Sequence, residues 1–257
     1  MVTETETNKY VLSREAGIAQ TVVLCDGIAR TGKAIIAPII GSFERVEILR
    51  VEETLDLTSW IYTMGKITQD AAVAMLRMKT DINLYNGMIG RDTNFRFGDY
   101  SSIWKNANPW RSIKRLKSSE GESTLKAASQ DRPIYQQTTH DQLGNLHLYL
   151  EAFGSHFRNI QMIRHPADLI DSWIRRGFGN RFGVDPLLFT ICFRHQGQDL
   201  PVYASGWEDV YLSATPEGRV IRMIEWIWDR NQSRYQSVDE TQQNQVFFIP
   251  FEDFVQR

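Results

Sequence analysis

The stretch VVLCDGIARTGKAIIAPII, residues 22–40, joins an apolar run to a second apolar run through a turn that glycine flanks on both sides. The β-branched run TVVL predicts a buried strand over residues 20–25, and KAIIAPIIGSF has the length and apolar face of a helix. The order strand, glycine turn, helix predicts an α/β fold, in which the turn meets the amino end of a helix.

Outward from this stretch, apolar runs alternate between strand-like and helical patterns. We predict strands at 45–52, 133–140, 159–163 and 245–253, and helices at 68–85, 141–157, 167–177 and 217–236. Such alternation favours three layers, a mostly parallel central sheet with helices on both faces. The strand, glycine turn and helix of residues 20–43 add the expectation that the fold is of the P-loop-containing nucleotide-binding type. Ligands of such sheets bind beyond the carboxyl ends of the strands.

Length and composition indicate an ordinary globular chain. The 257 residues are 42% apolar and 23% charged, with a formal net charge of -2, so we expect one domain over residues 1–257 and no bulk attraction to nucleic acid. The acidic, polar N-terminus and the lack of a long apolar run predict no membrane span and a cytoplasmic location. Cys25 and Cys192 are expected to be buried, reduced thiols.

Residues 87–131 fit this alternation poorly. The segment is rich in Gly, Asn, Ser and Asp, with scattered aromatic residues. We interpret it as an insertion that shapes a pocket for an acceptor molecule, with a variable surface excursion as the alternative.

The glycine turn carries the pattern G-x-x-x-x-G-K through Gly27, Gly32 and Lys33. Glycines let backbone N–H groups turn toward one anion, the helix terminus adds partial positive charge, and Arg30 and Lys33 add full charges. Ala34 stands where a Mg-ATP loop needs Ser or Thr to hold the metal, so we expect an anion site without a metal.

A second anion anchor is predicted in QMIRHPADLIDSW, residues 161–173. Arg164 ends a strand, Pro166 starts a helix and turns the chain, and Ser172 follows eight residues after the arginine, so both side chains can reach one phosphate. The alternative is a solvated arginine and a serine bonded within its helix. Further basic residues follow, as either an anion patch or a solvated helix end: Arg175, Arg176 and Arg181.

Together these segments resemble the sulfotransferase family, which uses 3'-phosphoadenosine 5'-phosphosulfate (PAPS) as sulfuryl donor. Arg164, Pro166, Asp168 and Ser172 match the family's R-x-P-x-D-x-x-x-S element, which holds the 3'-phosphate. RTGKA resembles the family's 5'-phosphosulfate loop, and FFIPFEDFV, residues 247–255, is similar to its late strand ending in Y-E-D-L. The resemblance implies donor contacts from Arg30, Thr31, Gly32, Lys33, Ala34, Arg164 and Ser172. Because family members commonly continue after this strand, the chain that stops at Arg257 is expected to be a fragment or a minimal form.

The chemistry implied by the resemblance is in-line sulfuryl transfer to a hydroxyl or amine of a small-molecule, lipid or saccharide acceptor. Arg30, and secondarily Lys33, would stabilise the leaving oxygen. His140 ends a predicted strand in a Thr-His pair, as in several sulfotransferases, and would accept the acceptor's proton. Its alternative is a structural neighbour of the following helix. His147 and His156 are expected to be packing or surface residues.

Two other functions stay open at this point. A P-loop kinase would use Mg-ATP with Lys33 on the phosphates, although Ala34 and the R-x-P-x-D-x-x-x-S element disfavour it. A nucleotide-binding module without catalysis is the third reading.

Overall fold

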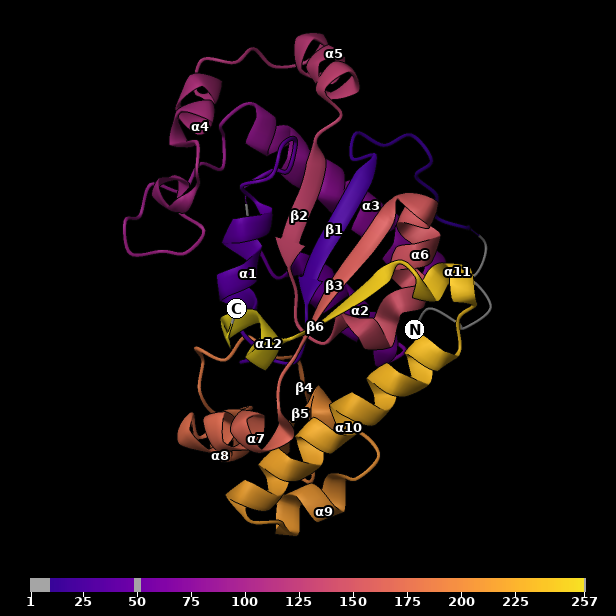
Figure 1. Ribbon diagram of the computed structural model, residues 1–257. Coiled ribbons are helices and arrows are strands. Elements are labelled where there is room, and N and C mark those ends of the chain that lie inside the picture. The colour runs from indigo at the N-terminus through magenta and orange to yellow at the C-terminus, as the bar shows by residue number, and fades with distance from the viewer. Residues whose placement is uncertain (1–9, 49–51, 257) are drawn as a thin grey trace.

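Four parallel strands form the central sheet of the protein. In the computed structural model, which describes residues 10–48 and 52–256, the strands follow the order β2 (Ile134–Thr138), β1 (Thr21–Asp26), β3 (Phe157–Ile163) and β6 (Val246–Pro250). Each neighbouring pair is parallel, so all four carboxyl ends lie at one edge of the sheet (Figure 1). The predicted mostly parallel α/β architecture is confirmed.

Helices cover both faces of this sheet. Alternate residues of β1 point to opposite sides, and those on each side pack against helices. Val22 and Leu24 join the largest apolar cluster, with residues of α3 (Gln69–Met88) and α6 (Leu146–Phe153). Cys25 instead packs with Ala37 of α1 (Lys33–Ile40) on the other face. Thr68 occupies the N-cap position of α3, but its side chain makes no capping hydrogen bond.

A second apolar cluster lies beyond the carboxyl ends of the strands. It includes Trp173 of α7 (Pro166–Arg175) and Ile227 of α10 (Pro216–Gln236), which runs as a long rod beneath the sheet in Figure 1. Smaller elements complete this region: α8 (Phe178–Arg181), the antiparallel pair β4 (Cys192–His195) and β5 (Gln198–Pro201), η4 (Val202–Ala204) and α9 (Glu208–Ser213). Within the described part of the chain, no helix is both long and apolar enough to cross a membrane.

The segment 87–131 folds into short helices that its sequence pattern did not reveal: η1 (Ile103–Lys105), α4 (Pro109–Arg115) and α5 (Glu122–Asp131). α4 and α5 lie beyond the end of the sheet where β2 begins, opposite to α7 and α10 (Figure 1). Arg111 and Arg115 of α4 both form ion pairs with the buried carboxylate of Glu47, which fastens the segment to the chain after α1.

Several predicted boundaries are wrong. Over the described part of 45–52 there is no strand: Val46 forms only an isolated bridge with Ile134, and Arg45 has a φ of 66° that no strand accommodates. Residues 49–51 of that prediction lie outside the described residues. The predicted strand 245–253 ends at Pro250, where α12 (Phe251–Gln256) begins. Cys192 is only partly buried, whereas Cys25 is buried as expected. The remaining elements are α2 (Thr54–Thr63), η2 (Gln142–Asn145), η3 (Gly154–His156) and α11 (Glu240–Gln243).

Candidate functional site

The glycine loop between β1 and α1 has a backbone that only glycine fits at its first position. Gly27 has a φ of 145°, and a Cβ there would overlap the carbonyl oxygen of Met162 in β3 and lie 2.7 Å from the Thr31 hydroxyl. Gly32 has a φ of 98°, and its missing side chain leaves room for the ring of Phe251. The loop therefore packs closely against the neighbouring strand and the start of α12.

The two polar side chains at the end of this loop close it from within. The Lys33 ammonium donates to the carbonyl oxygen of Gly27 and, at 3.2 Å, to that of Ile28, and the side chain is buried. The Thr31 hydroxyl donates to the same Ile28 carbonyl at 2.8 Å. In this conformation Lys33 and Thr31 stabilise the loop, and their predicted direct contacts with a donor stay predictions. Ala34 is exposed in the first turn of α1.

The second corner, between β3 and α7, brings Arg164 against the glycine loop. Its Nη1 donates to the carbonyl oxygen of Arg30 at 3.1 Å, and its guanidinium lies 4.9 Å from the ring centroid of Phe251. Its Nε is buried and has no hydrogen-bond partner among the described residues. Trp173 of α7 donates from its indole nitrogen to the carbonyl oxygen of Ala29 at 2.8 Å, which ties α7 to the same loop.

Arg30 lies between the two corners. Its Nε donates to the Ser172 hydroxyl at 3.3 Å, so Arg30, Arg164 and Ser172, which the sequence separates widely, share one site. Burial, then the charges of Arg176 and Arg164, lowers the pKa of Arg30. Arg30 and Arg164 thus lie at one site to which Arg176 adds positive charge, and like charges held together favour a bound anion. Glu252 lies at the edge, where it accepts from the His165 backbone N–H at 2.9 Å.

Three arginines follow this corner in the sequence, Arg175, Arg176 and Arg181, and two of them lie apart from the site. Arg175 forms an ion pair with Asp171 on the exposed face of α7, and Arg181 pairs with Asp185 at 2.6 Å. Of the three, only Arg176 contributes charge at Arg30.

His140 follows β2 and forms a pair with Asp56 of α2. Its Nδ1 lies 3.2 Å from Asp56 Oδ2, which also accepts from the His140 backbone N–H at 3.0 Å. The positive charge of Lys33 lowers the pKa of His140 to about 3, so the ring is neutral at neutral pH. The side chain is 48% exposed, so a neutral ring that Asp56 orients remains open on one side. The ring can therefore accept a proton, but its low pKa makes it a weaker base than an ordinary histidine.

Behind the glycine loop lies a cluster of three buried carboxyl groups around Lys33, which sequence reasoning missed: Asp26, Asp56 and Asp141. Asp26 accepts from the Gln142 and Leu143 backbone N–H groups and from the Thr139 hydroxyl. Burial raises the pKa of Asp141 to about 7, and burial together with the charge of Asp26 raises that of Asp56. The only sequence signal was an aspartate directly before Gly27, and strand-end aspartates are usually solvated.

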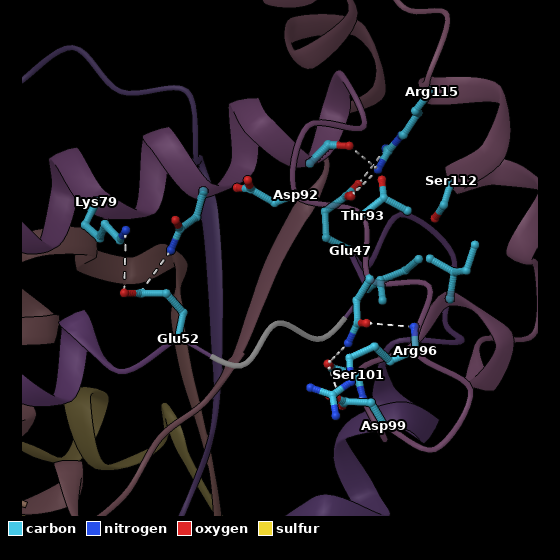
Figure 2. A pocket seen from close by; sticks show the side chains of 15 residues that line it. Glu47, Glu52, Lys79, Asp92, Thr93, Arg96, Asp99, Ser101, Ser112 and Arg115 are labelled. Carbon is cyan, nitrogen blue, oxygen red and sulfur yellow. Dashed lines mark hydrogen bonds and ion pairs between the residues drawn. The ribbon is translucent and has the colours of Figure 1, made fainter. Parts of the chain in front are cut away.

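The segment 87–131 helps to line a separate pocket of about 430 Å³, shown in Figure 2. Glu52 and Lys79 lie on one side of it, while Arg96 and Asp99 of the segment lie on the other. Burial, followed by the charges of Asp99 and Glu53, raises the pKa of Tyr100 in this segment. The segment's role in holding an acceptor stays a prediction.

No protein-family model matches the chain, and no curated protein matches it in sequence. The functional argument therefore depends on the geometry of the two corners and of the His140–Asp56 pair.

Proposed function

We propose that the protein is a sulfotransferase of P-loop-like architecture that moves a sulfuryl group from PAPS to a hydroxyl or amine of a small-molecule, lipid or saccharide acceptor. The observation that carries the proposal is that Arg30, Arg164 and Ser172 share one site at the carboxyl edge of a parallel sheet. This is the place where nucleotides bind to such sheets. PAPS is proposed as the donor because R-x-P-x-D-x-x-x-S resembles the element that holds its 3'-phosphate in sulfotransferases.

Each of the two corners would bind one end of PAPS. Arg164 and Ser172 would hold the 3'-phosphate, and the buried Nε of Arg164, which lacks a partner, fits a phosphate oxygen as its missing acceptor. The glycine loop and the first turn of α1 supply backbone N–H groups for the 5'-phosphosulfate, because the first N–H groups of a helix have no partner within it. Arg30 lies between the two ends of this ligand.

In the proposed transfer a bond forms between the acceptor oxygen or nitrogen and sulfur, and the bond from sulfur to the phosphate oxygen breaks. His140 takes the proton that the acceptor loses, and Asp56 holds the ring in place through Nδ1. Arg30 faces the negative charge that develops on the leaving phosphate, a kind of contact that contributes about 3 kcal/mol in other enzymes. Lys33 acts through the loop that it holds and through its charge, which keeps His140 neutral.

Calorimetry with adenosine 3',5'-bisphosphate and with ATP, each with and without Mg²⁺, tests the proposal. We expect the bisphosphate to bind without metal and more tightly than ATP. A preference for Mg-ATP would instead support a kinase, and binding of the bisphosphate without sulfate transfer to any alcohol, phenol, amine or glycan would support a binding module.

A further inference from the structure

A pocket of about 470 Å³ lies between α10, α2 and the turn that contains η2, away from the two corners. Arg230 and Arg234, one helical turn apart on α10, line it together with His147. Hydroxyl and amide groups complete the lining: Tyr62, Thr63, Asn145, Ser233 and Ser237. None of the described residues that line it carries a carboxylate, so the pocket combines two full positive charges with neutral polar groups.

Arg230 is fixed in the wall of this pocket. Its Nη2 donates to Asn145 Oδ1 at 2.6 Å and to the Thr63 hydroxyl at 3.0 Å, and its guanidinium stacks 4.6 Å from the centroid of Trp60. A Cβ at Gly144 would overlap its Nη1, so the chain leaves a glycine where the arginine passes. Burial lowers the pKa of Arg230 to about 10, and the group stays charged at neutral pH.

Arg234 and His147 supply groups that lack a partner. The guanidinium of Arg234 makes no hydrogen bond or ion pair with any described residue. His147 Nδ1 is buried without a partner, and its Nε2 lies 3.4 Å from the Tyr62 hydroxyl. Burial and then the charges of Arg234 and Arg230 lower the pKa of His147 to about 4, which reports an electropositive site. The Tyr62 hydroxyl donates to Gln69 Oε1 at 3.1 Å, so Nε2 of the neutral His147 ring carries the proton and points at Tyr62. Nδ1 becomes a donor when the ring is protonated.

We propose that this pocket is a second anion site, which binds a small organic molecule carrying a phosphate or sulfate group. Two guanidinium groups match a doubly charged oxyanion, and hydroxyl groups supply the further donors that tetrahedral oxygens accept. The volume exceeds that of a bare ion, which leaves room for an organic part. The inference does not depend on the proposed sulfotransferase activity, because no residue of the two corners lines the pocket.

The test follows the ring signals of His147 by NMR in the full chain while inorganic phosphate is added at constant ionic strength. We expect a saturable shift of the His147 signals and a higher titration midpoint for this ring, because a bound anion favours its protonated form. Arg234→Ala should weaken phosphate binding at least about tenfold. Arg234→Lys keeps the positive charge but loses the two-pronged guanidinium geometry. Its affinity for phosphate should lie between those of the wild-type protein and Arg234→Ala.

Three controls separate this site from other effects. Arg222→Ala removes an exposed arginine of α10 that pairs with Glu225, and it should leave the shift unchanged. Arg164→Ala should also leave it unchanged, which distinguishes this pocket from the corner site. Acetate should bind more weakly than phosphate. A His147 signal that does not saturate, equal binding in the Arg234→Ala and wild-type proteins, or acetate binding as tight as phosphate would each overturn the proposal.

Discussion

At the β1–α1 corner the lysine is buried beneath its own loop, whereas at the β3–α7 corner Arg164 lies beside that loop with a buried Nε that has no partner. At the first corner the chain changes direction at glycines with positive φ, and at the second it changes direction at Pro166, which starts α7. The glycine loop therefore satisfies its own side chains and offers backbone groups, while the second corner offers a side-chain cation. Changes at the first corner should affect stability, and changes at the second should affect binding.

The largest effect is expected from Gly27→Ala. The added Cβ would overlap the Met162 carbonyl oxygen in a φ region that L residues rarely adopt, so the free energy of unfolding should fall by about 4 kcal/mol. Urea denaturation measures it. Gly65→Ala is the matched control, because Gly65 also has positive φ but faces open space, and its cost should be about 1 kcal/mol. Equal costs would contradict the close packing of the loop on β3.

His140→Ala should come next. Loss of the base that Asp56 orients should lower turnover about 100- to 1000-fold, with donor affinity changed less than about twofold. Steady-state sulfate transfer and calorimetry measure the two quantities. His156→Ala, an exposed histidine of η3, should leave both unchanged. Unchanged turnover in the His140 variant would remove it as the base.

Arg164→Ala tests the second corner directly. The variant should bind adenosine 3',5'-bisphosphate about 30-fold more weakly and adenosine 5'-monophosphate almost normally, because a guanidinium–phosphate contact contributes about 2 kcal/mol. Arg175→Ala, whose arginine pairs with Asp171 on the exposed side of α7, serves as the control. If both nucleotides lost affinity equally, Arg164 would not be the 3'-phosphate anchor.

The smallest effect concerns Asp141, whose backbone N–H lies 3.4 Å from the Gly27 carbonyl oxygen at the first corner. Its folded pKa, raised to about 7, lies above the ordinary value of 3.8, so the unfolded state releases this proton first. Its contribution to stability is therefore present at low pH and is lost as pH rises from about 4 to about 7.

Asp141→Asn should remove this dependence and raise the free energy of unfolding at pH 8 by about 1 to 2 kcal/mol, since asparagine tolerates the φ of 60°. Urea denaturation at pH 5 and pH 8 checks it. Asp171→Asn, at an exposed carboxylate, should not alter the slope. A variant with the wild-type pH dependence would show that Asp141 is not the group responsible.

The elements with strong periodicity could be predicted from the sequence, and those that depend on tertiary contacts could not. Local apolar patterns predicted the elements of residues 22–40, α3 and α10, and the structure contains these elements at nearly the predicted positions. The predicted strand at 45–52 fails because the described residues 45–48 and 52 form no more than an isolated bridge, which joins Val46 to Ile134. α2, with its β-branched and aromatic residues, and the four-residue strands β4 and β5 were missed because their patterns are too short or mixed to assign.

The candidate site divides in the same way. The motif spacing predicts Arg30 at one strand-to-helix corner and Arg164 with Ser172 at another, whereas the strand order that makes β1 and β3 neighbours is seen only in the fold. The burial of Asp56 and Lys33 does not, because both depend on how α2 and η2 pack over the loop. Single acidic residues before a glycine turn look like solvated residues until the neighbouring elements are placed.

The bond from the Trp173 indole to the Ala29 carbonyl gives the protein a built-in optical reporter. An indole whose N–H is held by the loop changes its emission when that carbonyl shifts. In a variant that keeps Trp173 and replaces the other six tryptophans with phenylalanine, ligand occupancy at either corner becomes readable in real time without a label.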